Sequence, residues 1–306
     1  MNVHREIGGP GRDPRTCLTI GTFDGVHRGH RLILEELRRH AADLAGRSMV
    51  ITFHPHPQLV LRRHGDSVPT LTTLDERVAL LESAGVNDLL ILEFTPEVAA
   101  TPWQEFARRL IDTIGVGHMI FGHDHAFGRD RQGTASTVRL LGESEGFGVT
   151  EVGPLIVDGE TISSTKIRRA LATGDLDRAT EYLGRHYSLR GRVVRGDGRG
   201  RTLGIPTANI EPLDPAKLIP MEGVYAVSME IGGVTARGMA NIGRRPTFTT
   251  GGGRTIEVNL FDFDDDIYHN VVRVVFRKFV RSERKFDSVD EFLAQLEEDR
   301  IFCREH

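Results

Sequence analysis

Cysteine is scarce in this sequence, and long apolar runs are missing. The only two cysteines among the 306 residues, Cys17 and Cys303, lie near opposite ends of the chain. They can form neither a disulfide framework nor a zinc cluster, so a reducing cytoplasm is the expected environment. No apolar run approaches the roughly 20 residues of a membrane-spanning helix, and the N-terminus has no apolar signal-peptide region. We therefore expect a cytoplasmic protein with no membrane partner.

A strong excess of charge of either sign is also missing. The 39 Lys and Arg residues nearly balance the 43 Asp and Glu residues, which gives a formal net charge of −4. This balance provides no general attraction to nucleic acid or to anionic lipid. What is present is an ordinary globular composition, with 39% apolar and 27% charged residues. The chain is long enough to bury a sizeable core and to form two modest domains or one large one.

The first part of the chain alternates short apolar runs with helical periodicity. Strands are predicted at residues 17–20, 49–53, 88–92, 118–121 and 148–152. Helices are predicted at residues 30–44, 104–113, 136–143 and 164–183, and after a capping box formed by Thr73 and Glu76. Residues 1–15 look like an irregular arm. This alternation predicts an α/β fold, a doubly wound parallel sheet with helices on both faces.

The pattern changes near residue 184. From there on, strands are predicted at residues 189–195, 224–231, 235–242, 255–263 and 271–280, separated by turns rich in Gly and Pro. One helix follows at residues 288–300, with Ser288 and Glu291 as a second capping box. Several short strands and one terminal helix predict a small antiparallel β-barrel. We expect two domains, at residues 1–184 and 185–306.

The first candidate site is the segment Gly21-Thr-Phe-Asp-Gly-Val-His-Arg-Gly-His30, between a predicted strand and a predicted helix. Ligands of open α/β sheets bind at the carboxyl ends of strands, and a helix N-terminus there attracts phosphate. The glycines permit tight turns, and His27 and His30 can donate hydrogen bonds to phosphate oxygens. Such fixed donors suit attack on the α-phosphorus of a nucleoside triphosphate. The P-loop and dinucleotide-binding motifs are absent, and the alternative is a Gly-rich loop with two solvated histidines.

This segment resembles the signature of the adenylyltransferase module of bacterial bifunctional riboflavin kinase/FAD synthetases, in the H-x-G-H nucleotidyltransferase superfamily. A second segment, Ile162-Ser-Ser-Thr-Lys-Ile-Arg168, resembles the superfamily's ISSTxIR element. It would cap a helix N-terminus and bring positive charge to a triphosphate. The resemblance implies a Rossmann-like domain in which His27 and His30 are catalytic. It assigns ATP binding to Gly21, Phe23, Asp24, Gly25, His27, His30, Ser163, Ser164, Thr165, Lys166 and Arg168.

Two histidine-containing segments extend the resemblance. Phe53-His-Pro-His-Pro57 matches the family, and residues 121–133 resemble its flavin-side loop. The resemblance implies flavin binding by Asp124, Phe127 and Gly128, whereas His125 stands where an aromatic ring is commoner. The histidine pairs are spaced i, i+2, but no Cys or Glu completes a zinc-ligand set, so we do not predict a zinc site.

The second candidate site lies in residues 191–210, G-R-V-V-R-G-D-G-R-G-R-T-L-G-I-P-T-A-N-I. An Arg/Gly segment can bind single-stranded nucleic acid, but this one has no interleaved aromatic residues. A Gly-rich loop whose backbone amides bind phosphate fits better. Thr207 and Asn209 alternate on an extended stretch, so their side chains point the same way. Hard oxygen ligands of this kind suit magnesium with a nucleotide.

This segment resembles the G-x-G-R-G-x-x-L-G-x-P-T-A-N motif of riboflavin kinase modules, and residues 223–226, 241–248, 257–263 and 281–286 resemble later parts of the same module. The resemblance implies that Glu257 is the general base. It places Mg²⁺ at Thr207 and Asn209. It assigns ATP or flavin binding to Gly196, Gly198, Gly200, Arg201, Gly204, Pro206, Thr207, Asn209 and Arg281.

Some residues depart from the expected patterns. Asn259 stands where the family more often has His, and His269-Asn270 where a Gly is usual. The acidic run at residues 262–266 begins like an EF-hand, but Ile267 replaces the required Gly and Arg273 the required Glu. We therefore do not predict calcium binding.

The resemblance runs from about residue 17 to about residue 300 and implies a bifunctional enzyme. Its barrel would phosphorylate riboflavin to FMN, and its first domain would adenylylate FMN to FAD and release pyrophosphate, with Mg²⁺ and ATP in both steps. The expected partners are riboflavin, FMN, FAD and ATP, without nucleic acid, and a homo-oligomer remains open. One alternative is a different phosphate-bearing acceptor, such as nicotinate mononucleotide or phosphopantetheine. The other is a non-enzymatic flavin sensor, which the presence of Thr207, Asn209 and Glu257 disfavours.

Overall fold

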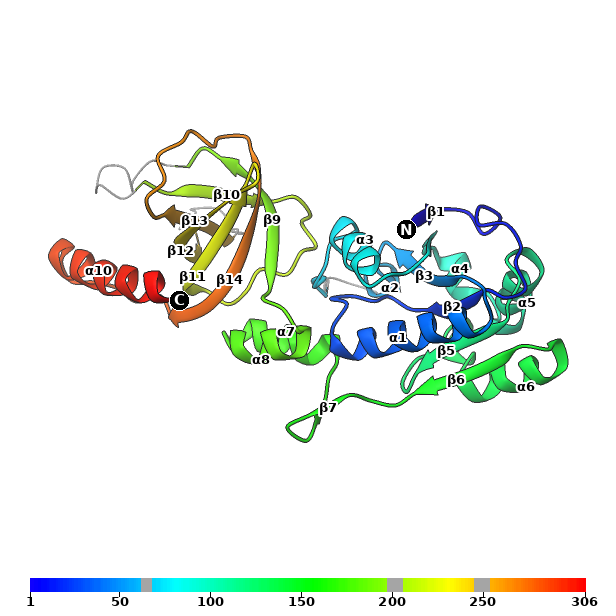
Figure 1. Ribbon diagram of the computed structural model, residues 1–306. Helices are drawn as coiled ribbons and strands as arrows, with labels where there is room; N and C mark the ends of the chain where they lie inside the picture. Colours follow the sequence, from blue (N-terminus) through cyan, green and yellow to red (C-terminus); the bar gives the residue numbers. More distant parts are fainter. Residues whose placement is uncertain (62–67, 197–205, 245–253) are drawn as a thin grey trace. The chain divides into compact units, whose positions relative to one another are not determined.

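Six parallel strands form the sheet at the centre of the first half of the computed structural model, in the order β1-β4-β3-β2-β5-β6 (Figure 1). They are β1 (Asn2–His4), β2 (Cys17–Ile20), β3 (Ser48–His54), β4 (Asp88–Glu93), β5 (His118–Gly122) and β6 (Gly148–Val152). The structure describes residues 1–61, 68–196, 206–244 and 254–306. They form two compact units, Met1–Ser164 and Thr165–His306, which we describe separately.

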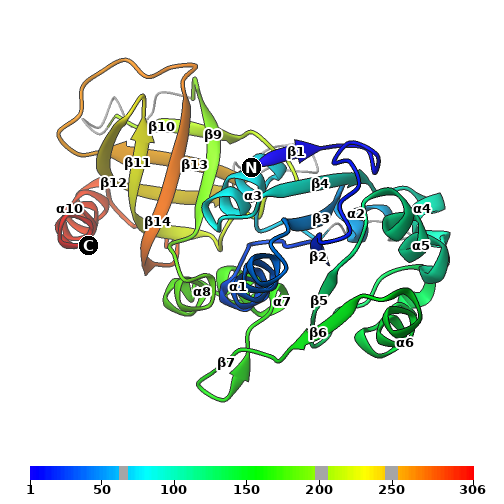
Figure 2. The same cartoon turned by 45° about the vertical axis from the view of Figure 1, so that its right-hand side comes forward.

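Helices cover both faces of this sheet. The helices α1 (Arg28–Asp43) and α3 (Leu74–Ser83) pack on one face, where Leu37 and Leu81 meet Val50 of β3. The helices α5 (Trp103–Thr113) and α6 (Ala135–Glu145) pack on the other, where Leu110 and Val138 share a core with Met49 and Ile51. Successive residues of β3 thus enter opposite cores, as a strand's alternation requires. Figure 2 shows the two pairs of helices on opposite sides of the sheet, which confirms the doubly wound prediction.

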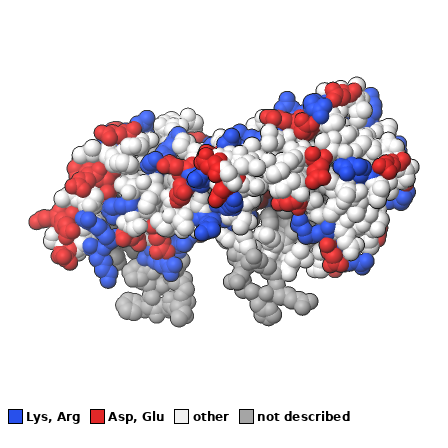
Figure 3. Space-filling view, turned by 90° about the horizontal axis from the view of Figure 1, so that it is seen from below, with Lys and Arg blue, Asp and Glu red and all other residues white. Residues whose placement is uncertain are grey.

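Shorter elements connect these layers. They are α2 (Pro57–Leu61), α4 (Pro96–Ala100), the 3-10 turn η1 (Arg129–Arg131), and a hairpin of β7 (Ile156–Val157) and β8 (Glu160–Thr161). Within the described ranges, no helix combines the length and low polarity needed to cross a bilayer. Acidic and basic side chains are interspersed over the face drawn in Figure 3, in keeping with the net charge of −4.

The second unit contains a closed antiparallel barrel with strand order β10-β13-β12-β11-β14-β9. Its strands are β9 (Ser188–Val194), β10 (Ala208–Pro212), β11 (Gly223–Ile231), β12 (Val234–Arg244), β13 (Arg254–Leu260) and β14 (Val271–Arg281). The C-terminal helix α10 (Val289–Glu305) packs Leu296 and Cys303 against Ala226 and Met239. The predicted barrel and terminal helix are therefore confirmed.

Three details differ from the sequence prediction. The N-terminal arm is not irregular throughout, because β1 pairs with β4 in parallel register. The single helix expected at residues 164–183 is two helices, α7 (Ser164–Ala172) and α8 (Leu176–Leu183), separated at Gly174, whose φ of +77° ends the first. Thr73 and Glu76 form the predicted capping box, whereas the Glu291 carboxylate accepts the backbone amide of Asp287 in place of that of Ser288.

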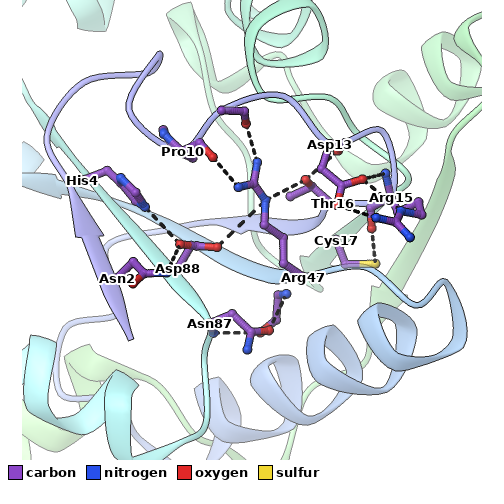
Figure 4. A network of polar contacts seen from close by, with 12 residues as sticks. Asn2, His4, Pro10, Asp13, Arg15, Thr16, Cys17, Arg47, Asn87 and Asp88 are labelled. Carbon is purple, nitrogen blue, oxygen red and sulfur yellow. Dashed lines mark hydrogen bonds and ion pairs between the residues drawn. The ribbon is translucent and has the colours of Figure 1, made fainter.

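Two side chains hold the N-terminal arm against the sheet (Figure 4). The Asp88 carboxylate accepts a hydrogen bond from the Asn2 amide and contacts His4 Nε2, both at 3.0 Å. The Arg47 guanidinium donates to the carbonyl oxygens of Pro10 and Gly11 and, at 3.1 Å, to the hydroxyl of Thr16. The arm is therefore held by polar contacts, with little core of its own.

We expect Arg47→Met to lower the free energy of unfolding of the first unit by about 1–3 kcal/mol, because three acceptors lose a charged donor. Trp103 is the protein's only tryptophan and lies in this unit, so its fluorescence during urea unfolding reports the change. Arg39→Met is the matched control, since Arg39 is exposed and pairs with Glu36 and Asp43 on its own helix. Equal losses in the two variants would contradict the role given to Arg47.

Acid should destabilise the first unit through His118. Burial and the nearby positive charges of His40 and Arg39 lower the pKa of His118 from 6.5 to about 4. Its Nε2 lies 2.9 Å from the Thr150 hydroxyl, and its ring stacks on His40 at 3.8 Å. Because the unfolded chain binds the proton first, stability is full above pH 6.5 and falls as the pH drops toward 4.

We expect His118→Gln to lose less stability than the wild type between pH 7 and pH 4.5, as measured by Trp103 fluorescence during urea unfolding. Some dependence should remain, because burial also lowers the pKa of His125 to about 4. Identical slopes in variant and wild type would show that His118 is not a source of the acid sensitivity.

Candidate active sites

The first candidate site is the loop at residues 21–27, between β2 and α1. Its first amide, of Gly21, donates to the Ile51 carbonyl at 2.9 Å, which keeps the chain beside β3 as it leaves the sheet. Further on, Phe23, Gly25 and Val26 have φ values of +47°, +84° and +36°. Two of these residues are not glycine, so the conformation is unfavourable locally and depends on contacts from outside the loop.

Asp24 provides the main contacts of this kind. Its side chain is only 1% exposed. Its carboxylate accepts the amides of Leu71 and Thr72 at 3.0 Å and the Thr72 hydroxyl at 3.1 Å. The Thr72 hydroxyl in turn accepts the Gly25 amide at 3.0 Å. Asp24 therefore joins the loop to the segment before α3, while the ATP contact assigned to it from the sequence stays a prediction.

His27 and His30 stand together at the N-terminus of α1. His27 is the N-cap residue, and its Nδ1 accepts the His30 amide at 3.3 Å, so a neutral His27 carries its proton on Nε2. The two rings stack, with centroids 3.6 Å apart and an interplanar angle of 17°. Because the positive end of the helix dipole lies at the same place, this corner favours a negatively charged ligand.

The second motif of this site begins beside the loop. The Ser164 hydroxyl donates to the Asp24 carbonyl at 2.9 Å, at the first residue of α7. Ser163 precedes this helix, and Thr165, Lys166 and Arg168 follow within its first turns. The contacts with the triphosphate assigned to these four residues and to Ser164 stay predictions.

The predicted flavin loop follows β5. Phe127 is buried and packs against Phe106 and Phe121, at centroid distances of 5.7 and 6.1 Å. Gly128 has a φ of +75°, and a Cβ there would lie 2.6 Å from Trp103 Cα, so only glycine fits. Asp124 is exposed. Packing alone thus accounts for the buried ring of Phe127 and for glycine at position 128. Flavin binding by Asp124, Phe127 and Gly128 stays a prediction.

In the second unit, cross-strand pairing surrounds Glu257 with uncharged polar side chains. Glu257 on β13 pairs with Asn209 on β10 and with Asn241 on β12, so the three side chains share one face. The Thr207 hydroxyl donates to Glu257 Oε2 at 3.4 Å. The structure therefore brings together Thr207, Asn209 and Glu257, which the sequence proposed from separate motifs.

The neighbouring motif residues are only partly described. A Cβ at Gly196 would lie 2.1 Å from Asn209 Nδ2, so a larger residue there would displace the Asn209 side chain. The Pro206 carbonyl accepts the side-chain amide of Asn259 at 2.7 Å. The Asn that stands here in place of the family's more common His thus forms a hydrogen bond within the barrel. Gly198, Gly200, Arg201 and Gly204 lie outside the described residues.

Arg281 has a protein partner. Its Nε donates to Asp299 Oδ1 at 3.0 Å, and its Nη2 lies 2.7 Å from Oδ2 of the same carboxylate, which is 2% exposed. This bidentate pair joins the end of β14 to α10. The ligand contact assigned to Arg281 stays a prediction.

Sequence reasoning missed several residues that shape the two sites. In the first unit these are Thr52, Leu71, Thr72 and Arg77, which hold the loop but belong to no motif. In the second unit they are Asn241 and Glu283, joined by a hydrogen bond of 3.2 Å next to Glu257. Asn241 and Glu283 did have a signal, because both lie in segments that resemble the family, at residues 241–248 and 281–286.

The first unit has a Rossmann-like sheet with an H-x-G-H loop, and the second has a closed barrel with a Thr/Asn/Glu cluster. Together these features define a two-domain transferase that uses nucleotides. The family model for FAD synthetase matches residues 10–166, and that for riboflavin kinase matches residues 183–306. The chain therefore belongs to the family of bifunctional riboflavin kinase/FMN adenylyltransferases.

Individual relatives agree with this assignment. The chain is 36% identical over 290 residues to the bifunctional riboflavin kinase/FMN adenylyltransferase of Bacillus subtilis (strain 168), covering 94% of this chain and 90% of the relative. It is 39% identical over 290 residues to that of Escherichia coli (strain K12), covering 94% and 91%. A crystal structure from Streptococcus pneumoniae, described as a macrolide-efflux protein, has a TM-score of 0.91 at 33% identity, covering 99% of this chain and 98% of that one.

We expect Asp299→Ala to lower the stability of α10 against β14 by about 3 kcal/mol, because it leaves the Arg281 cation without its buried partner. Native-state hydrogen exchange in increasing urea, followed on peptides from residues 289–305, measures this loss. Asp177→Ala is the matched control, since its pair with Lys278 is exposed. If both variants lose protection equally, Arg281 and Asp299 do not hold the helix.

Proposed function

We propose that this chain catalyses both steps from riboflavin to FAD, each in its own unit. The barrel phosphorylates riboflavin to FMN, and the first unit transfers the adenylyl group of ATP to FMN. The observation that carries the proposal is that each unit holds its own cluster of suitable polar groups. These are the His27–His30 corner at the N-terminus of α1 and the Thr207–Glu257 cluster on the barrel.

In adenylyl transfer, a phosphate oxygen of FMN attacks the α-phosphorus of ATP, and pyrophosphate leaves. The FMN phosphate is already anionic at neutral pH, so no protein group has to remove a proton. What the protein supplies is stabilisation of negative charge. His27 and His30 are held together at the start of α1, where the positive end of the helix dipole also lies, before any ligand binds.

In riboflavin phosphorylation, the nucleophile is a neutral hydroxyl, so a proton acceptor is needed. The 5′-hydroxyl of the ribityl chain attacks the γ-phosphorus of ATP, its proton passes to the Glu257 carboxylate, and ADP leaves. The neighbours of Glu257 on the adjoining strands, Asn209 and Asn241, are uncharged. The carboxylate is therefore available for the proton.

The groups near Glu257 also fit a magnesium ion. They are a hydroxyl, a carboxamide oxygen and a carboxylate, all hard oxygen donors of the kind that Mg²⁺ prefers. Thr207 and Asn209 would hold the ion. When bound with ATP it would neutralise charge on the phosphates. Riboflavin, FMN and ATP are then the substrates, and we place the enzyme in the cytoplasm, where its two buried free cysteines stay reduced.

We expect Glu257→Gln and His30→Ala to separate the two activities. Glu257→Gln should lower riboflavin phosphorylation by about 10²–10⁴-fold and leave FMN adenylylation unchanged. His30→Ala should lower adenylylation by about 10²–10³-fold and leave phosphorylation unchanged. Chromatography of flavins after incubation of each purified variant with ATP, magnesium and either riboflavin or FMN measures both rates.

Glu230→Gln is the matched control, because Glu230 is also a strand carboxylate but pairs with Arg273 on the barrel surface. It should change neither rate. If one of the two test variants lost both activities while folded, the assignment of two sites would be wrong. If the wild-type chain stopped at FMN, the first unit would use another acceptor, and if it formed no product, a flavin sensor would be favoured.

A further inference from the structure

Arg77 is a charged side chain in the core of the first unit. It lies near the start of α3, is 2% exposed, and is among the largest fully buried side chains of the described residues. Its Nε atom is buried without a hydrogen-bond partner among them. A guanidinium remains charged in proteins, and burying a charge is costly unless it serves specific contacts. The contacts of Arg77 therefore indicate its structural role.

These contacts lead to the first candidate site. Arg77 Nη1 donates to the Thr52 hydroxyl at 3.1 Å and to the Phe53 carbonyl at 3.2 Å, both near the carboxyl end of β3. The Thr52 hydroxyl donates in turn to the Thr22 carbonyl at 3.2 Å. Because the Thr52 hydroxyl accepts from Arg77 through a lone pair, its single proton stays available for the hydrogen bond to the loop. Arg77 is thus joined to the loop through one intermediate side chain.

Arg77 also interacts electrostatically with Asp24 of the same loop. Burial lowers the pKa of the Arg77 guanidinium, and the nearby Asp24 carboxylate opposes this shift. Asp24 is the buried acid that accepts the Leu71 and Thr72 amides. Two buried opposite charges stabilise each other, and removal of one leaves the other without compensation. Loss of the Arg77 cation should therefore loosen the loop at Asp24 as well as at Thr22.

We propose that Arg77 is a positioning residue for adenylyl transfer, which holds residues 22–25 so that the loop amides and the His27–His30 corner meet the triphosphate correctly. The inference rests on the function proposed for the first unit. Arg77 itself need not touch ATP, since its guanidinium ends on Thr52 and Phe53. The positive φ angles of Phe23 and Val26 make outside support necessary, because unsupported residues would relax toward commoner conformations.

The test uses three variants of the full chain, Arg77→Met, Arg77→Lys and Thr52→Val. Arg77→Met should lower kcat for FMN adenylylation by about 10²-fold, as expected for misplaced catalytic groups, with a smaller change in KM for ATP. Arg77→Lys keeps the charge without the planar guanidinium, and its kcat should be about tenfold higher than that of Arg77→Met. Thr52→Val leaves Arg77 in place but breaks its connection to Thr22, and should lower kcat by about tenfold. The double variant Arg77→Met/Thr52→Val should have nearly the same kcat as Arg77→Met alone, because the two residues act through the same connection.

Riboflavin phosphorylation by the same molecules is the internal control for folding and should not change in any variant. Arg108→Met is the matched arginine control, because Arg108 forms an exposed ion pair with Glu145, and it should change neither activity. Hydrogen exchange gives a readout that does not depend on catalysis. Peptides from residues 21–30 should exchange faster in Arg77→Met, while peptides from residues 223–244 of the barrel should be unchanged.

If the wild-type chain adenylylates FMN, two results would overturn the proposal. One is wild-type adenylylation and wild-type loop exchange in both Arg77→Met and Thr52→Val. The other is an equal loss of both activities in all three variants, which would indicate a general folding role. If the wild-type chain converts no FMN, the proposed function fails separately. The exchange experiment then decides the claim about Arg77, and unchanged exchange of residues 21–30 overturns it.

Discussion

The first unit depends on one buried carboxylate. Asp24 accepts two backbone amides and a hydroxyl from Leu71 and Thr72, and its own carbonyl accepts the Ser164 hydroxyl. Segments far apart in the chain therefore meet at this residue. The conformation that they fix contains Phe23 and Val26 at positive φ, each with a cost of about 1 kcal/mol or more. Without Asp24 the loop would lose its contacts with Leu71 and Thr72, and only weaker supports such as the Thr52–Thr22 hydrogen bond would hold its shape.

Much of the fold followed from the sequence, because most strands of the sheet are continuous apolar runs. Residues 49–51 and 89–91 enter cores on both faces and could be recognised without knowledge of their partners. The strand β1 could not be recognised, since Asn2, Val3 and His4 have no pattern and become a strand only by pairing with β4. The break between α7 and α8 did have a local signal, Gly174 followed by Asp175, which caps α8.

The positions of the candidate sites in the fold were predictable where a motif has a fixed local sequence. The histidines at the helix N-terminus and the Thr207–Glu257 cluster lie where their motifs indicated. Their supports were not predictable, because Arg77 lies between charged and apolar helix residues and looks solvent-facing until the fold buries it. The same limit affects residues assigned by resemblance. The sequence suggests ligand contacts for Asp24 and Arg281, yet their charged groups bind Thr72 and Asp299, contacts that depend on the folded structure.

On the proposed function, the two nucleophiles explain why the carboxylates of Asp24 and Glu257 have such different surroundings. Attack by an anionic phosphate needs no proton acceptor, and in the first unit the carboxylate of Asp24 is buried and occupied by protein donors. Attack by a hydroxyl does need one. Glu257 accepts a single long hydrogen bond from Thr207, and among the described residues no lysine or arginine forms an ion pair with it. Most of its lone pairs are thus left for the proton that the proposed mechanism transfers. The number of protein hydrogen-bond donors around a carboxylate therefore separates the structural role of Asp24 from the role of general base proposed for Glu257.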